Sequence, residues 1–292
     1  MMFPLVQDLA AAGVPVAVTC RVLGFTKQAY YKWQARPCSP RDEDDAHLID
    51  ALRDAHHDDP AFGYRLLADE LAADGHVASE RRVWRLCSQE GIASEISKRG
   101  RGKGKRRTGP AVHDDRVQRV FTAAGPNEIW LTDITEHWTR EGKLYFCAIK
   151  DVFGNRIVGY ATGPRMTARL AVAALEDAVA RRGNVAGCIV HSDRGSQFRA
   201  RRFRKALRRH QLVGSMGRVG AAGDNAAMES FFSTLQTNVL DSRRWETRTQ
   251  LRLAIIHWIE ATYNRRRRQR RLGKLSPVAF EDIMRSAVAL AA

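Results

Sequence analysis

Three carboxylates in this chain stand where metal chemistry would use them. Asp133 lies in the middle of a predicted core strand, Asp193 follows the end of another predicted strand, and Glu229 stands at the start of a predicted helix. A charged side chain in or beside a buried strand is costly unless it is paired or binds a metal ion. Hard oxygen ligands of this kind suit Mg²⁺ or Mn²⁺. The three residues are therefore candidate metal ligands.

Each carboxylate also has an ordinary structural interpretation. Asp193 precedes Arg194 and Gly195 and would fit a turn, whereas Glu229 at a helix start would be favoured by the helix dipole. The chain has no GxxxxGK[ST] pattern, which argues against an ATPase site. Residue types and spacing alone indicate a metal-dependent enzyme that acts on nucleic acid.

The segment that must position these side chains, residues 121–240, alternates strand and helix patterns. A continuous apolar run at 144–149 suits a buried central strand. Three strands, then helix, strand, helix, strand and helix predict an α/β core, a five-stranded mixed sheet with flanking helices. The expected strands cover 128–138, 144–149, 156–161, 186–190 and 212–216, and the expected helices cover 167–182, 200–210, 228–239 and 249–263.

Two helical segments at the amino end are typical of helix-turn-helix units. In residues 1–40, Gly24 makes a turn and Thr26 can cap a polar, aromatic helix, although a small bundle without a DNA role fits equally well. In residues 41–94, Ser79 can cap a basic helix of a second unit. The candidate DNA contacts on that helix are Arg81, Arg82 and Arg85.

A basic run separates these units from the core. Seven of the ten residues from 98 to 107 are basic and glycines lie between them, a composition that cannot build a core. We expect residues 95–120 to be a linker that follows DNA phosphates, and a plain solvated linker is compatible with that role. The candidate contacts in the linker are Lys103, Lys105, Arg106 and Arg107.

Residues 241–292 are expected to form a basic helical extension. Six of the seven residues from 265 to 271 are arginine, which favours contact with the DNA backbone over a solvated helix end. The candidate contacts there are Arg265, Arg266, Arg267 and Arg268.

The overall composition points to a polyanionic partner. Lys plus Arg total 48 against 32 acidic residues, giving a formal net charge of +16, and each neutralised phosphate releases condensed counterions. Five scattered cysteines without a CxxC pair argue against a disulfide framework or a zinc module and fit a reducing cytoplasm. No apolar run is long enough to span a bilayer, so we expect a cytoplasmic, nucleoid-associated protein without membrane contact.

Four strings carry a resemblance to a known family. They read WLTDIT, HSDRGSQF, GDNAAMESFFSTLQTNVL and YNRRRRQRRLGKLSPVAFE, and thirty-five residues separate Asp193 from Glu229. The chain resembles the second-frame transposases of the bacterial insertion-sequence family three over nearly its whole length, from the Gly63-Tyr64-Arg65 block to Phe280. More distantly, it resembles retroviral integrase cores.

The resemblance implies a ribonuclease-H-like catalytic core preceded by all-α helix-turn-helix units. It implies that Asp133, Asp193 and Glu229 form a DDE triad that holds two Mg²⁺ or Mn²⁺ ions per active site, and that His191 and Asn225 support it. A strand-end histidine and a helix-capping asparagine explain these last two residues equally well. The implied function is metal-dependent strand cleavage and strand transfer at the ends of an insertion sequence.

The resemblance also implies partners. These are the terminal inverted repeats of the element, target DNA, further copies of the chain in a synaptic complex, and an upstream-frame protein as fusion or partner. The alternative function is a catalytically inactive DNA-binding regulator derived from a transposase, although all three carboxylates are present. The chain departs from the family pattern at Gln269, where a His is usual, and at Gln236, where a Lys is usual.

Overall fold

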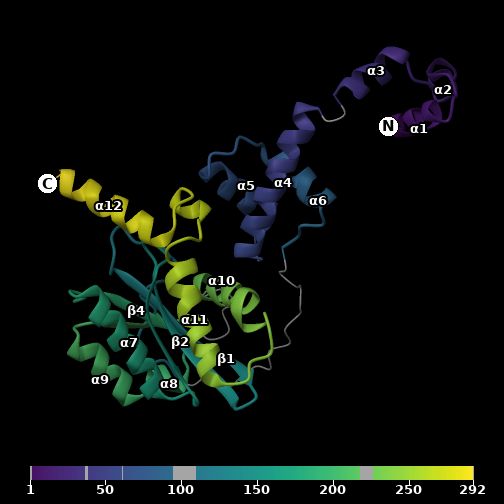
Figure 1. Ribbon diagram of the computed structural model, residues 1–292. Helices are drawn as coiled ribbons and strands as arrows, with labels where there is room; N and C mark the ends of the chain where they lie inside the picture. Colours follow the sequence, from purple (N-terminus) through teal and green to yellow (C-terminus); the bar gives the residue numbers. More distant parts are fainter. Residues whose placement is uncertain (1, 37–38, 61, 95–109, 218–225, 292) are drawn as a thin grey trace. The chain divides into compact units, whose positions relative to one another are not determined.

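The computed structural model describes residues 2–36, 39–60, 62–94, 110–217 and 226–291 (Figure 1). The chain divides into two compact units. One contains Met1–Asp58 and Gly63–Ala93, and the other contains Asp59–Phe62 and Ser94–Ala292. Among the described residues, no helix has the length and apolarity that a membrane span requires.

The first unit begins with three short helices, α1 (Phe3–Ala11), α2 (Val16–Val22) and α3 (Lys27–Ala35). They pack through a small core that includes the buried side chains Phe3, Val6, Cys20 and Tyr30. The predicted cap of the third helix is present, because the Thr26 hydroxyl accepts a hydrogen bond from the Ala29 N–H at 3.1 Å. This satisfies one of the orphan donors at the helix start.

Three further helices follow in this unit, α4 (Pro40–Asp58), α5 (Tyr64–Ala73) and α6 (Glu80–Gln89). Their apolar faces bury Leu52, Leu67 and Val83 completely. The Ser79 hydroxyl caps α6 by accepting from the Arg82 N–H at 3.2 Å, as the sequence predicts. All the regular secondary structure among the described residues of the amino-terminal unit is therefore helical.

The second unit is built on a five-stranded sheet with the order β3-β2-β1-β4-β5. The strand β1 pairs antiparallel with β2 and parallel with β4, so the sheet is mixed, as predicted. The pairs β2–β3 and β4–β5 are antiparallel and parallel, respectively. The strands are β1 (Ile129–Thr139), β2 (Gly142–Asp151), β3 (Ile157–Gly163), β4 (Ile189–Ser192) and β5 (Val213–Met216).

Helices cover both faces of this sheet (Figure 1). Successive residues of a strand point to opposite faces, so Trp130 and Leu131, both fully buried, belong to two separate cores. The core around Trp130 is completed by α7 (Ala168–Arg182), α8 (Ser196–Arg199) and α9 (Arg201–Arg209). The core around Leu131 is completed by α10 (Ala226–Leu235), the π-helical segment η1 (Gln236–Leu240), α11 (Arg248–His257) and the π-helical segment η2 (Trp258–Tyr263).

The chain ends with a 3₁₀ turn, η3 (Arg270–Leu272), and the helix α12 (Pro277–Ala291). A buried ion-pair network fastens this end to the sheet. The Arg182 guanidinium lies 2.9 Å from the Asp151 carboxylate and 2.7 Å from that of Glu281, which also binds Arg156 at 2.9 Å. The network ties β2, α7 and α12 together, which makes the carboxy-terminal segment part of the fold.

Some expected boundaries differ from the structure for local reasons. The fourth strand begins at Ile189 instead of residue 186, because Gly187 has a φ of +82° and makes a turn before the strand. The predicted helices at 228–239 and 249–263 both change to π-helix in their second halves, which periodicity alone does not reveal.

Gly159 on β3 allows α7 to approach the sheet closely. A Cβ atom at this position would lie 2.5 Å from the backbone N of Ala178 and 2.6 Å from the carbonyl O of Ala174. We therefore expect Gly159→Ala to lower the free energy of unfolding by about 3 kcal/mol, the upper part of the range for overpacked cores. Urea unfolding measures this loss. The control is Gly163→Ala, because the nearest atom to a Cβ there is 3.6 Å away. Equal losses in the two variants would contradict the prediction.

Candidate active site

Asp133 and Asp193 lie on the same face of the sheet at neighbouring strands. In the parallel pair of β1 and β4, Leu131 is the partner of His191. Asp133 stands two positions beyond Leu131, and Asp193 stands two positions beyond His191, one residue past the end of β4. Residues two apart on a strand share a face, and neighbouring strands lie about 4.8 Å apart. The register therefore places the two aspartates side by side.

A buried thiol lies within the electrostatic reach of both aspartates. Burial raises the pKa of Cys147 on β2 to about 12, and the negative charges of Asp133 and Asp193 both contribute to this increase. Both carboxylates thus act electrostatically on one buried group.

The local hydrogen bonds hold each aspartate in place. The Asp133 carboxylate accepts from the Ile134 N–H at 2.7 Å, and the Asp193 carboxylate accepts from the Gly195 N–H at 2.9 Å. Although Asp193 as a residue is exposed, neighbouring protein atoms desolvate its carboxyl and raise its pKa, which the Gly195 bond opposes. A bound cation would favour the charged form and offset that desolvation.

Glu229 lies in the first turn of α10 and is exposed. The helix α10 covers the sheet face that carries Asp133, because Met228 and Phe231 pack into the same core as Leu131. Asp133 and the helix that carries Glu229 therefore lie on the same side of the sheet.

A buried lysine forms a hydrogen bond between this face of the sheet and the start of α10. Lys150 is the cross-strand partner of Leu131, is only 5% exposed, and donates from its Nζ to the Ala227 carbonyl at 3.1 Å. Burial lowers the pKa of Lys150 to about 8, and the charge of Arg271 adds to this effect. Sequence analysis does not identify Lys150. The only signal is a lysine at the end of the apolar run from 144 to 149.

The carboxylate oxygens of Asp133, Asp193 and Glu229 are suitable ligands for a divalent metal ion. Asp133 and Asp193 each stand two positions beyond the paired residues Leu131 and His191, and Glu229 is on a helix whose start is bonded to the same face through Lys150. Hard oxygen donors of this kind are those that Mg²⁺ and Mn²⁺ prefer. Within the described parts of the chain, no three His, Cys, Asp or Glu side chains are already grouped closely enough to hold a metal.

His191 is positioned by structural contacts. It is 2% exposed, and its Nδ1 lies 2.9 Å from the Ser215 hydroxyl, which also accepts from the Arg116 N–H at 2.9 Å. The ring faces that of Phe121 edge-on, with 6.5 Å between centroids. These contacts join β4 to β5 beside the two aspartates. Asn225 lies outside the described residues.

The candidate DNA contacts of α6 differ in their availability. Arg81 is exposed, whereas Arg82 and Arg85 both bind the Asp45 carboxylate of α4 at 2.6 Å. Hydrogen bonds from these two arginines lower the pKa of Asp45. Their guanidinium groups therefore join α6 to α4. The linker candidates Lys103, Lys105, Arg106 and Arg107 lie outside the described residues.

The four carboxy-terminal arginines also differ from one another. Arg265 and Arg266 are exposed, and Arg268 is partly buried. Arg267 forms an ion pair with the buried Asp59 and stacks over the Phe62 ring at 4.8 Å. Arg267 is thus part of the packing of this unit.

The two positions that depart from the family pattern have partners of their own. The Gln269 side chain accepts from the Asn155 amide at 3.0 Å, which ties the carboxy-terminal segment to the turn between β2 and β3. The Gln236 amide donates to Asp241 at 2.6 Å at the start of η1. Both glutamines therefore make local hydrogen bonds in this chain.

Family models match most of the chain. Two models described as an integrase core domain match residues 123–222 and 201–277, and one described as an HTH-like domain matches residues 40–100. Together with the sheet order, these matches confirm the predicted ribonuclease-H-like core and the helical units before it.

Similar proteins match over nearly their full length. The insertion element IS600 uncharacterized 31 kDa protein of Shigella sonnei is 36% identical over 264 residues, which are 90% of this chain and 97% of that protein. Transposase InsF for insertion sequence IS3A of Escherichia coli (strain K12) is 33% identical over 270 residues, 91% of this chain and 94% of that protein. The HTLV-2 integrase catalytic core domain in complex with magnesium aligns with a TM-score of 0.43 and 16% identity, covering 54% of this chain and 98% of that one.

Proposed function

Because the chain belongs to the family of insertion-sequence transposases that includes InsF of IS3, we propose that it cuts and joins DNA strands at the ends of its element through Asp133, Asp193 and Glu229. The observation that supports this proposal is the parallel register of β1 and β4, in which Leu131 pairs with His191, because Asp133 and Asp193 each stand two positions beyond this pair. The start of α10, which holds Glu229, is anchored over the same face. Protein side chains that project from rigid elements in this way suit precise positioning of a phosphodiester.

We infer that two Mg²⁺ or Mn²⁺ ions would be held at this site by Asp133, Asp193 and Glu229. When bound, such ions stabilise the attacking and leaving oxygens of an in-line displacement. The residues of the chain orient that donor set. The Gly195 N–H fixes the Asp193 carboxylate, and Lys150 holds the helix that carries Glu229.

The proposed reaction has two steps. In the first, water attacks the phosphorus of the phosphodiester at the element end, and the P–O3′ bond of that same phosphodiester breaks. The element end is left with a 3′-hydroxyl and the flanking DNA with a 5′-phosphate. In the second, that hydroxyl attacks another phosphodiester, so one P–O bond forms as another breaks. No covalent protein intermediate is needed, and neither is ATP.

We propose that the helical units 1–40 and 41–94, the linker 95–120, the core 121–240 and the extension 241–292 have different roles in this enzyme, although the extension packs into the core. The helical units would bind the terminal inverted repeats and the core would act on them and on target DNA. Two element ends must be brought together, so a homo-oligomer in a synaptic complex is expected. An upstream-frame protein would act as fusion or partner, and the protein would work in the cytoplasm at the nucleoid.

The test is a strand-transfer assay with oligonucleotides that carry the element's own ends, run with Mg²⁺, with Mn²⁺ and with EDTA. The chain should be assayed alone and as the upstream fusion. We expect joined products that depend on the metal. DNA binding without joined products in either form would support the inactive regulator instead.

The exposed and buried arginines near the carboxy-terminal end should behave differently when replaced. We expect Arg265→Ala with Arg266→Ala to weaken binding to all DNA sequences and to reduce the salt slope by up to about two, because two exposed cations that can contact phosphates are removed. Arg267→Ala should instead lower the free energy of unfolding by about 3 kcal/mol, because the buried Asp59 carboxylate loses its partner. Fluorescence anisotropy at several salt concentrations and urea unfolding measure the two effects. Similar effects of both changes on stability would contradict the assignment.

A further inference from the structure

The helix α9 carries a concentration of positive charge that no part of the candidate active site uses. Its nine residues, RRFRKALRR, contain six basic and no acidic side chains. The apolar residues Phe203, Ala206 and Leu207 are buried in the core around Trp130. The exposed cations are Arg201, Arg202, Lys205, Arg208 and Arg209.

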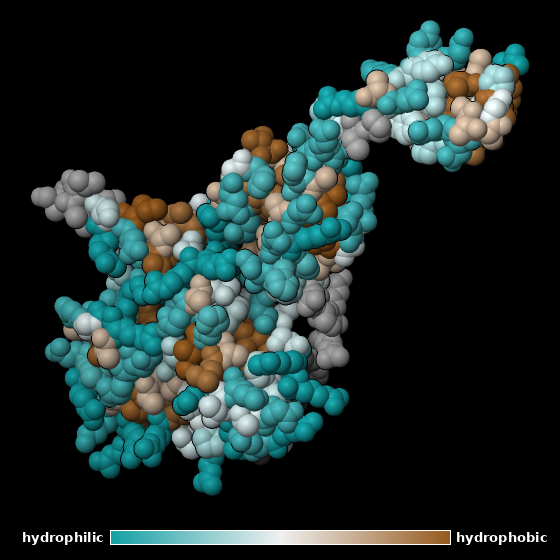
Figure 2. Space-filling model, viewed as in Figure 1, coloured by the Kyte–Doolittle hydropathy of each residue, from teal (hydrophilic) through white to brown (hydrophobic). Residues whose placement is uncertain are grey.

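These cations are poorly compensated by acidic groups. Arg209 lies 3.2 Å from the Glu176 carboxylate. Within the described parts of the chain, no ion pair involves Arg201, Lys205 or Arg208, which share one helix face at spacings of four and three residues. Like charges at such spacings repel one another, so the helix gains from a counterion. Figure 2 shows hydrophilic residues over this helix.

The positive surface continues beyond α9 to the segment before the sheet. Arg204 is partly buried, and its Nε has no hydrogen-bond partner among the described residues. Arg204 and Arg116 are both close enough to His113 to lower its pKa, after the larger effect of burial, while Asp114 opposes them. Arg116 is exposed. The His113 ring packs against Gly214 of β5, and Arg204 of α9 and Arg116 are both near this ring, so the basic region extends from α9 to residues 113–116.

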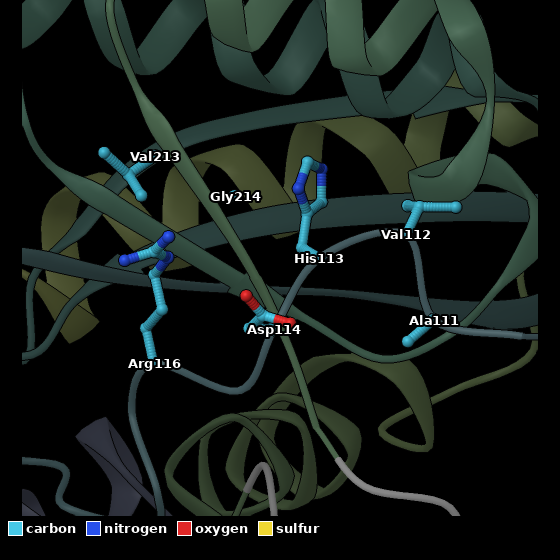
Figure 3. Close-up of a pocket in the computed structure, with 7 residues that line it drawn as sticks. All are labelled: Ala111, Val112, His113, Asp114, Arg116, Val213 and Gly214. Atoms are coloured by element: carbon cyan, nitrogen blue, oxygen red, sulfur yellow. The ribbon is translucent and has the colours of Figure 1, made fainter.

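A pocket lies at the edge of this surface. It has a volume of about 430 Å³ and is lined by Ala111, Val112, His113, Asp114, Arg116, Val213 and Gly214. Figure 3 shows the His113 ring and the Arg116 side chain on either side of Gly214. A Cβ atom at Gly214 would come within 2.5 Å of the His113 ring, so glycine is required for this close packing. The pocket is open to a group the size of a phosphate and has Arg116 at its border.

The helix α9 is on the opposite face of the sheet from the candidate carboxylates, whereas Arg116 lies at the sheet edge beside Ser215 of β5. The helix α9 packs into the core around Trp130, whereas Asp133 shares its face with Leu131. A phosphodiester at the carboxylates therefore cannot also contact α9. Any DNA on α9 is a different segment from the one that is cut.

We propose that α9, Arg204, Arg116 and the pocket beside Gly214 form a second DNA-binding surface that contacts the phosphate backbone of duplex DNA without regard to sequence. From Arg201 to Arg208 the helix rises about 10 Å, and a duplex presents one negative charge for about every 1.7 Å of its axis. The row of cations thus faces several phosphates. The proposal deepens the proposed transposase function by adding a holding site for DNA away from the reaction.

The test compares two triple variants of the full chain. The first is Arg201→Gln with Lys205→Gln and Arg208→Gln. The matched control is Arg165→Gln with Arg169→Gln and Arg252→Gln, which removes three exposed cations from other parts of the same unit. Binding to a duplex of unrelated sequence is measured by fluorescence anisotropy over a range of KCl concentrations.

We expect the α9 variant to lose about tenfold or more in affinity near 100 mM salt and to show a salt slope shallower by up to about three. The DNA affinity of the control variant should remain within about twofold of the wild-type affinity. The assay measures DNA binding and does not require the chain to join DNA strands. A chain that fails to join strands can therefore still show whether this surface binds DNA. An unchanged affinity and slope in the α9 variant would overturn the proposal.

A second variant tests the same surface in case the triple variant in α9 does not fold. Arg116→Gln leaves α9 intact, and its side chain borders the pocket. We expect it to weaken binding about twofold to fivefold and to lower the salt slope by about one, with an unchanged thermal unfolding curve. If both variants bind DNA as wild type does but self-associate less in sedimentation velocity, the surface binds another copy of the chain and the proposal is wrong.

Discussion

Asp193→Asn is expected to reduce strand cleavage and strand joining by at least about a thousandfold, while DNA affinity stays within about twofold of wild type. The substitution preserves the shape of the side chain, and its Oδ1 can still accept from the Gly195 N–H. It removes one negative charge from the proposed metal ligands and no cation from a DNA-binding surface. Each factor of ten corresponds to about 1.4 kcal/mol, and metal ions stabilise such transition states by several kcal/mol.

Strand transfer with Mg²⁺ and anisotropy with the same oligonucleotides measure the two effects. The matched control is Asp282→Asn, because that carboxylate is largely exposed on α12 and its nearest cation, Arg285, is 3.7 Å away. The control should keep wild-type activity. Full activity of Asp193→Asn would exclude this residue as a metal ligand, and a large loss of DNA binding would mean that it has another role.

The fold of the catalytic unit could be predicted because local patterns and packing agree there. The apolar run at 144–149 is the centre of β2, and Thr167 caps α7, which ends at Arg182 as expected. The π-helical segments η1 and η2 could not be predicted, because they depend on how the helices fit the sheet beneath them. Predicted strand boundaries were wrong where an apolar pattern includes a glycine turn, such as the turn at Gly187 before β4.

The candidate site, too, could be predicted only in part from the sequence. The sequence identifies three carboxylates, but only strand pairing places Asp133 level with Asp193, because register is a long-range property. The same limit affects the arginines. Arg267 and Arg265 stand in one run of basic residues, yet only Arg267 meets a buried carboxylate, contributed by Asp59, which is distant in sequence. Charge runs predict a partner class without telling which side chains are free to bind it.

Lys150→Met is expected to make the protein more stable near neutral pH and less active, two effects of opposite sign. The pKa of Lys150 is about 8 in the folded chain, below its ordinary value of 10.5. Below pH 8 the lysine is charged in both states, so the folded state bears the full cost of burying the charge. Removing that charge should raise the free energy of unfolding at pH 7 by about 2 kcal/mol, after allowing for the lost hydrogen bond.

The pH dependence of stability gives this expectation a distinct signature. Between pH 8 and 10.5 the unfolded wild type holds the Lys150 proton more tightly than the folded protein does. Wild-type stability from this group therefore rises with pH across that interval. The advantage of Lys150→Met should shrink over the same interval and disappear above it. Urea unfolding at pH 7, 9 and 10.5 measures this change.

The loss of activity follows from the position of Lys150 under α10. Methionine cannot donate to the Ala227 carbonyl, so the start of the helix that carries Glu229 loses its attachment to the sheet. A displacement of about 1 Å at a reacting centre can cost about a hundredfold in rate, and we expect a loss of that size in strand transfer. Lys150→Arg should recover part of the activity, because it restores a donor.

Lys143→Met on the same strand is the matched control. Its side chain is 30% exposed and its ammonium pairs with the partly exposed Glu136 at 2.7 Å, so its replacement should change neither stability nor activity by much. If Lys150→Met loses stability and activity together, the lysine simply supports the fold. A gain in stability with a loss of activity would instead mean that the buried charge is kept for the position of α10, since a methionine at this site would serve the core better.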